Sequence, residues 1–266
     1  MKSPFSSRRT SESSTLAAAA LFLIQVVLPM SFVVGQGTAA FESKAAGQKV
    51  FYSDERAGNN QVTVFSESTL EDFTSVCNRV AGQCTIDPKR VETFAGRFSI
   101  RVEDLTTGME LRDQHMVAPE WLDAAQFPEI SVQIDKVEEV SKTGPNTISL
   151  FLMGTCTIRG ATRPVRISAN LTYLEETPET MRRVKGDLLR IRAEFDVKLA
   201  DYGINGPPGS DFIGLKVAES VKIKVTVFGS TERPPDPLKV DRPEGKTKRV
   251  PIAPAERRPT PPTATP

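Results

Sequence analysis

The chain has 266 residues, and its 34 lysine and arginine residues nearly balance its 33 aspartate and glutamate residues. This balance argues against a nucleic-acid partner, because such partners are bound through an excess of positive charge that replaces phosphate counterions. A single histidine, His115, leaves too few imidazoles for the common zinc sites and one candidate base for a Ser-His-Asp triad. We therefore expect no metal site and no enzyme; an activity centred on His115 would have no candidate reaction.

Residues 1–40 have the pattern of a secretory signal. Lys2, Arg8 and Arg9 precede an apolar run over residues 16–34, and small residues follow up to Ala40. A positive start, an apolar run and a small-residue exit are typical of a cleaved export signal. An uncleaved anchor stays open, because a run of this length can span a bilayer. We expect a periplasmic or extracellular protein, which is anchored in the membrane if the segment is kept.

The first elements after this segment are short. Residues 62–65 begin a predicted strand, and residues 68–76 are predicted as a two-turn helix. Cys77 and Cys84 flank a short polar loop. Because an exported protein can form disulfides, we predict a Cys77–Cys84 bridge. Cys156 lies in an apolar stretch and is predicted to be a small buried side chain.

The middle of the chain alternates between apolar and polar residues. In residues 189–199 every second residue is apolar and the residues between are charged. A strand places alternate side chains on opposite faces, so this period indicates sheets with one apolar face. A second short helix is predicted over residues 117–125. The same alternation predicts strands over residues 98–102, 130–134, 148–158, 165–171 and 221–227.

These strands need a cover for their apolar faces. The pattern contains no long helix that could supply it, so the sheet has to pack on a second sheet or close on itself. The predicted fold class is therefore all-β, with antiparallel strands and one or two short helices. Alternation alone leaves a sandwich and a barrel open.

The C-terminal residues 231–266 differ in composition from the rest of the chain. They hold ten of its twenty prolines, with lysine and arginine between them. Proline lacks the N–H that a helix or sheet needs, and the segment has little apolar material to bury. We predict a disordered tail, which serves either as a spacer or as a contact with an anionic surface of the cell envelope.

Four blocks of sequence occur in a characteristic order. They are F-Y-S-D at 51–54 with the strand at 59–68, the stretch 96–132, M-G-T-C-T-I-R-G-A-T-R-P-V at 153–165, and F-D-V-K-L-A-D-Y-G-I at 195–204. Together they resemble the YceI-like polyisoprenoid-binding family, whose members are small exported lipocalin-like barrels around a long lipid tail. The resemblance implies an antiparallel barrel of about eight strands over residues 41–230.

The resemblance also implies a function. It is an exported lipid-binding protein that holds a polyisoprenoid of the quinone or polyprenyl type in the barrel, for carriage or sequestration, with no required cofactor. The alternative is a ligand-free envelope module that acts through the basic tail. The interior of such a barrel would be lined by Phe98, Ile100, Leu150, Leu152, Ile191, Phe195, Val225 and Val227.

Polar residues between the apolar runs allow two interpretations. At the barrel mouth, Arg112 or His115 would donate hydrogen bonds to a ligand headgroup. Alternatively, Arg112 and Asp113 pair with each other or with the backbone and fix the crossover between strand and helix; Asp201 and Tyr202 leave the same two possibilities open. The residues concerned are Arg112, Asp113 and His115, together with Asp201 and Tyr202.

Overall fold

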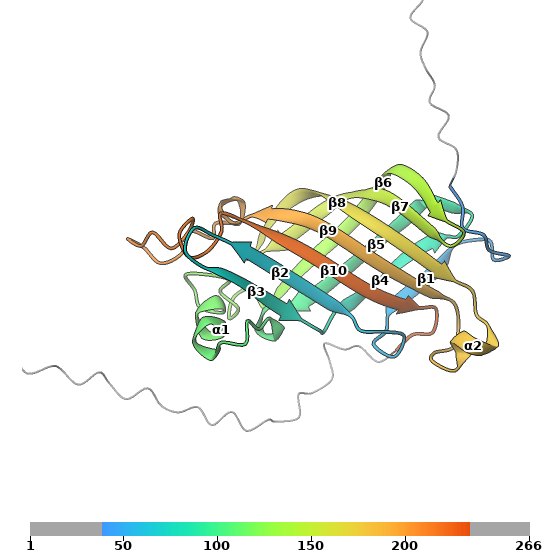
Figure 1. Cartoon of the computed structure of the whole chain (residues 1–266), viewed down its shortest axis with the longest axis horizontal. Coiled ribbons are helices and arrows are strands. Elements are labelled where there is room, and N and C mark those ends of the chain that lie inside the picture. The colour runs from blue at the N-terminus through green and yellow to red at the C-terminus, as the bar shows by residue number, and fades with distance from the viewer. Residues whose placement is uncertain (1–38, 235–266) are drawn as a thin grey trace, which may run out of the picture. The chain divides into compact units, whose positions relative to one another are not determined.

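Antiparallel strands dominate the computed structural model, which describes residues 39–234 (Figure 1). Two short α-helices, α1 (Glu110–Met116) and α2 (Pro178–Met181), and two 3-10 helices, Val102–Asp104 and Leu199–Tyr202, lie between the strands. This is the predicted all-β class. In chain order the strands are β1 (Lys49–Ser53), β2 (Gln61–Glu67), β3 (Asp72–Cys77), β4 (Ala81–Asp87), β5 (Arg90–Arg101), β6 (Glu129–Gly144), β7 (Thr147–Ile158), β8 (Ala161–Leu174), β9 (Leu188–Lys198) and β10 (Ser220–Ser230).

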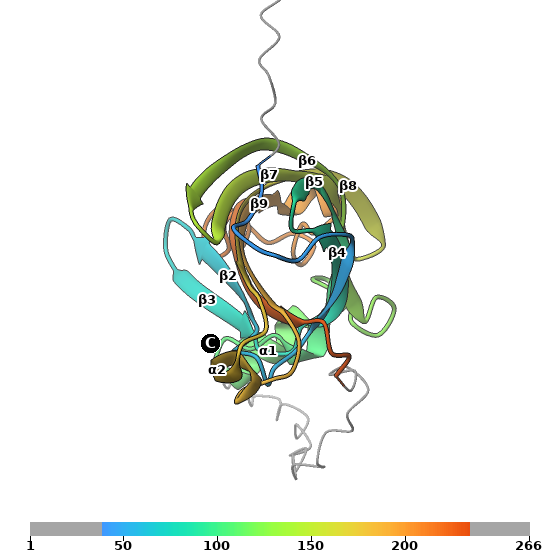
Figure 2. The same cartoon turned by 90° about the vertical axis from the view of Figure 1, so that its right-hand side faces the viewer.

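Eight of these strands close into a barrel. They pair in the order β1-β4-β5-β6-β7-β8-β9-β10, and the pairing of Tyr52 with Ser230 joins β1 back to β10. On the edge of β10 that faces away from β9, only the C-terminal end pairs with β1, and the N-terminal half pairs with β2. β2 and β3 form a hairpin beside the ring of strands (Figure 2). The structure therefore decides for the barrel, which the alternation leaves open.

The long strands β6 and β7 show how the wall curves. Buried and half-exposed residues alternate along the whole of β7. Gly154 of β7 crosses β6 so closely that a Cβ there would lie 2.0 Å from the carbonyl oxygen of Gln133. The register between the two strands shifts next to this point, between Ile134 and Lys136. Close glycine contacts and bulges bend a sheet, and here they help it to close.

The structure corrects both predicted helices. Residues 68–76 contain no helix, because residues 72–77 form β3, which pairs with β2 along its whole length. Strand pairing outweighs the weak helical preference of so short a segment. Residues 117–125 form turns, and the helix lies before them and ends at Met116. Pro119 lacks a backbone N–H and disfavours helix in the residue before it, so the helix ends ahead of it.

Both predicted terminal segments lie almost wholly outside the described residues. This holds for the export segment, residues 1–40, and for the proline-rich tail, residues 231–266. Within residues 39–234, the structure contains no helix with the length and apolar character needed to cross a membrane.

Candidate ligand-binding site

A cavity of about 870 Å³ occupies the half of the barrel next to α1. Its wall consists mainly of inward-facing apolar residues of β5 to β10, to which β2 and β3 add Val62, Val64 and Phe73. The volume lies within the range of ligand-binding pockets. Seven of the eight residues predicted to line the interior do line this cavity, namely Phe98, Ile100, Leu152, Ile191, Phe195, Val225 and Val227.

Leu150 is the exception, and its position shows where the cavity ends. It lies two residues from Leu152 on the same face of β7, but it is buried and does not line the cavity. It belongs to the packed core, together with the buried rings of Phe51, Phe94 and Tyr173. The cavity follows β7 over roughly 20 Å of strand before it meets this core. Large side chains thus fill one end of the barrel and leave the other end hollow.

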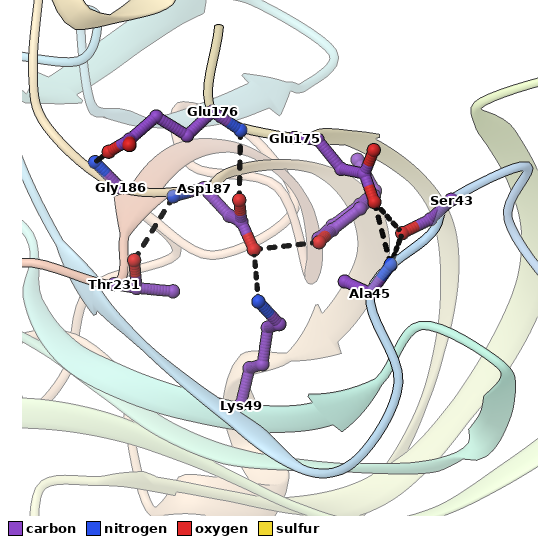
Figure 3. A network of polar contacts seen from close by, with 9 residues as sticks. Ser43, Ala45, Lys49, Glu175, Glu176, Gly186, Asp187 and Thr231 are labelled. Atoms are coloured by element: carbon purple, nitrogen blue, oxygen red, sulfur yellow. Dashed lines mark hydrogen bonds and ion pairs between the residues drawn. The ribbon is translucent and has the colours of Figure 1, made fainter.

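The filled end, which carries α2, is closed by a network of polar contacts (Figure 3). Asp187 accepts hydrogen bonds from the Tyr173 hydroxyl (2.7 Å) and from the backbone N–H of Glu176 (2.9 Å), and it pairs with Lys49. Burial acts to raise the pKa of Asp187, but the hydrogen bonds from Lys49 and Tyr173 outweigh it and hold the pKa below its ordinary value. The ring of Phe41 stacks on Tyr173 with centroids 5.4 Å apart. The cavity therefore opens toward α1.

Two segments between strands form the mouth of the cavity. One is α1 with the turns up to residue 126, and the other is the loop 204–217 between β9 and β10. Arg159, in the turn between β7 and β8, anchors the first segment and the residue that precedes the second, because its guanidinium donates to the carbonyl oxygens of Pro119 (2.8 Å) and Gly203 (2.6 Å). The two segments also meet where the Trp121 indole lies close to Gly206. The mouth is thus built from segments that are tied to the barrel.

Arg112 and His115 project from α1 and line the cavity at its mouth. The Arg112 guanidinium forms an ion pair with the Glu71 carboxylate and lies 4.7 Å from the centroid of the Phe73 ring. These two contacts join α1 to β3 across the mouth. His115 is exposed. Arg112 therefore fixes the position of α1, while both residues stay beside the entrance through which a ligand would pass.

Asp113 has a structural role in the loop before α1. Its carboxylate accepts hydrogen bonds from the Thr106 hydroxyl (2.6 Å) and from the hydroxyl (2.6 Å) and backbone N–H (2.7 Å) of Thr107. Burial acts to raise the pKa of Asp113, but these hydrogen bonds outweigh it and lower the pKa. Asp113 does not line the cavity. Its contacts agree with the interpretation that it fixes the crossover between strand and helix.

Asp201 and Tyr202 are not brought together with Arg112 and His115. Both lie in the 3-10 helix after β9, and neither lines the cavity. Tyr202 is buried, and burial together with the neighbouring Cys156 thiol raises the pKa of its hydroxyl. The next residue, Gly203, has a left-handed φ of 68°, which suits a glycine at the end of this turn. Both residues therefore lie in the turn at the end of β9, outside the lining of the cavity.

The structure does not contain the predicted Cys77–Cys84 disulfide. Both cysteines, like Cys156, are free and buried. Cys77 ends β3, which pairs with β2, whereas Cys84 lies in β4 between β1 and β5, so their strands are not neighbours in the sheet. Burial raises the pKa of Cys77 and of Cys156 to about 11. Cys77 and Cys84 are therefore close along the chain, but they lie on strands that do not pair with each other.

The chemistry of the site is that of an apolar interior with a polar entrance. Within residues 39–234, no three histidine, cysteine, aspartate or glutamate side chains gather into a metal site. The charged side chains of the lining lie on the two segments of the mouth, which carry Arg112, Glu120 and Lys216, and on the turn between β2 and β3 beside them, which carries Glu71. Such an interior can bury a long apolar molecule and leave a polar end at the mouth.

Several lining residues were missed from the sequence because they lie outside the strands. Trp121 and Leu122 belong to the turns after α1, and Phe212 and Val217 belong to the loop before β10. Alternation cannot indicate which way such side chains point. The available signal was the occurrence of large apolar residues within segments that are otherwise typical of turns.

Comparison with known proteins identifies the family. Residues 53–228 match the model of the YceI-like domain. A UPF0312 protein of Pseudomonas fluorescens is 28% identical over 145 residues, which cover 54% of this chain and 70% of that protein. The crystal structure of Burkholderia cenocepacia BcnA has the same fold, with 16% identity and a TM-score of 0.50 over 64% of this chain and 95% of that chain. So does a Campylobacter jejuni YCEI protein, with 14% identity and a TM-score of 0.50 over 63% and 90%. The chain therefore belongs to the YceI-like family.

Proposed function

We propose that this protein is an exported lipid-binding protein that holds a polyisoprenoid, of the quinone or polyprenyl type, inside its barrel for carriage or sequestration. The observation that carries the proposal is the shape of the interior. It is apolar, it holds about 870 Å³, it is closed at the α2 end and it opens at the α1 end. A molecule with one long apolar tail fits such a space with its polar end at the mouth.

Burial of the tail would supply most of the affinity. Each methylene group removed from water contributes about 0.8 kcal/mol. About fifteen buried carbons would therefore contribute on the order of 12 kcal/mol before the cost of association. The guanidinium of Arg112 is already engaged by Glu71 and Phe73. We expect binding to depend strongly on tail length and weakly on the headgroup.

Export is the second part of the proposal. It rests on the charge, the apolar run and the small residues of positions 1–40. The mass of the mature protein tests it, because cleavage near Ala40 removes the whole segment. A mature protein that keeps residues 1–40 would contradict cleavage and favour an anchor.

The binding itself is tested by native mass spectrometry of the protein purified from its own host, followed by solvent extraction. We expect one adduct per chain with the mass of an isoprenoid lipid, which the extract then identifies. A mass without ligand that stays unchanged after incubation with quinones and polyprenols would overturn the proposal. That result would favour the ligand-free envelope module.

A further inference from the structure

Large apolar side chains are exposed around the mouth of the cavity. Residues 39–234 contain seven exposed large hydrophobic side chains, and five of them lie on the segments that surround the mouth. Leu70 is 68% exposed, Leu111 64% and Met109 55%. The other two, Leu174 and Met181, belong to the end that carries α2. We call the group at the mouth the apolar rim; its members are Leu70, Met109, Leu111, Phe212 and Leu215.

The apolar rim is continuous with the cavity. Met109, Leu111 and Phe212 line the cavity itself. Phe212 also lines a second, shallow hollow together with Leu70 and Leu215. The exposed surface therefore leads from the outside of the molecule directly into the lined interior. A contiguous exposed apolar surface of this kind marks an interaction site.

Hydrogen bonds hold the apolar rim in place. The backbone N–H of Leu70 donates to the carbonyl oxygen of Leu215 (2.8 Å), and the Thr69 hydroxyl donates to that of Gly214 (3.0 Å). These bonds tie the turn between β2 and β3 to the loop before β10. The ion pair between Glu71 and Arg112 ties the same turn to α1. Three segments that are distant in sequence thus present their apolar side chains on one ordered frame.

The surroundings of the apolar rim fit a lipid bilayer. The charges of Glu71 and Arg112 are paired with each other. The ammonium group of Lys216 lies 5.1 Å from the centroid of the Phe212 ring, so its stem runs beside the apolar surface. An aromatic ring next to a lysine that can extend toward water is typical of side chains at a membrane interface. A bilayer is also the phase in which a molecule with a long apolar tail resides.

We propose that the apolar rim docks on the surface of a lipid bilayer, so that an apolar tail passes between the bilayer and the cavity without crossing water. The passage of the tail rests on the proposed function, whereas docking requires the apolar rim alone. Insertion of apolar side chains drives the docking, because residues 68–71, 109–126 and 204–217 around the mouth carry six acidic residues and two basic ones, an excess that does not attract anionic headgroups. Neutral lipids should therefore suffice.

Flotation of the full chain with neutral phosphatidylcholine vesicles tests the docking. The flotation is carried out in high salt, which screens the attraction between lipids and charged groups, such as the basic residues of the tail, and leaves the insertion of apolar side chains. The test variant is Leu70→Ser with Leu215→Ser, since neither side chain lines the cavity. The matched control is Leu174→Ser with Met181→Ser at the opposite end. We expect the test variant to partition about tenfold or more weakly than the wild type, and the control to behave as the wild type.

Two outcomes would overturn the docking proposal: a wild type that stays unbound, or equal losses in the test and control variants. Native mass spectrometry of the same samples separates the two proposals. A test variant that retains its lipid but loses vesicle binding supports both. Vesicle binding by a wild type whose cavity accepts no lipid overturns the proposed function and leaves the docking in place.

Discussion

Replacing Ala193 with tryptophan should fill the cavity without placing a charge in it. Ala193 lines the cavity from β9, and its neighbours across the sheet are Ala169 of β8 and Val225 of β10. The alanine leaves space that a long tail can occupy, and an indole would take that space. The perturbation is therefore steric and acts on the proposed binding site directly.

The size of the effect follows from the apolar surface that the ligand loses. An indole at this position displaces about four methylene-sized groups of the tail, which at about 0.8 kcal/mol each amounts to about 3 kcal/mol. This corresponds to roughly 100-fold weaker binding. Shorter tails, which do not reach Ala193, should lose less. A series of polyprenols of increasing length thus gives a loss that grows with length until the tail reaches Ala193.

The assay is reloading of delipidated protein, with the bound polyprenol quantified by mass spectrometry. Glu194→Trp is the matched control, because Glu194 is the adjacent residue on β9 and its side chain is 46% exposed. The melting temperature, followed by circular dichroism, shows whether each variant is folded. Ala193→Ile, a smaller change, serves if the indole prevents folding. A folded Ala193→Trp protein that binds long polyprenols as the wild type does would refute binding in the interior.

Three further predictions concern stability and the cysteines. Gly154→Ala should lower the free energy of unfolding by about 1–3 kcal/mol, because its Cβ would meet a backbone carbonyl of β6; Gly144→Ala, whose Cβ would make only ordinary van der Waals contact with the Thr147 side chain (3.7 Å), should have little effect in the same urea titration. The pKa of Asp187 is lowered in the folded state, so its stabilisation is complete above about pH 4 and is lost as the pH falls through the folded pKa. Asp187→Asn should therefore lower the melting temperature at neutral pH, and its difference from the wild type should shrink in acid; a difference independent of pH would contradict this. Three thiols should react with Ellman's reagent in guanidinium and almost none in the native protein, because Cys77, Cys84 and Cys156 are free and buried; one reactive thiol after unfolding would indicate a disulfide.

The strands that sequence predicted are those with clear alternation. Residues 148–158 lie within β7, and residues 189–198 lie within β9. β1 and β4 are shorter, and alternation does not indicate them, since β4 carries Gly82 and Gln83 near its start and offers little periodicity. The segment 68–76 was predicted as helix because its pairing with β2 is not visible in its own residues.

The lining of the candidate site also contains residues that the sequence predicts and residues that it does not. Seven predicted lining residues lie on strands, where the period of two determines the inward face. Leu150 has the same pattern as Leu152, yet it is packed against the core, since how deeply the hollow extends depends on Phe51, Phe94 and Tyr173 from other strands. Trp121 and Phe212 lie in turns, whose side-chain directions depend on the surrounding structure.

The sequence by itself determined the all-β class, the inward face of each long strand and the resemblance to the family. These are local properties, because alternation is a consequence of the geometry of a single strand. Only the tertiary structure decided the closure of the barrel through β1 and β10, the depth of the cavity, the separation of Cys77 from Cys84 and the gathering of the apolar rim. Each of these depends on contacts between segments that are distant along the chain, and no single segment carries the information that specifies them.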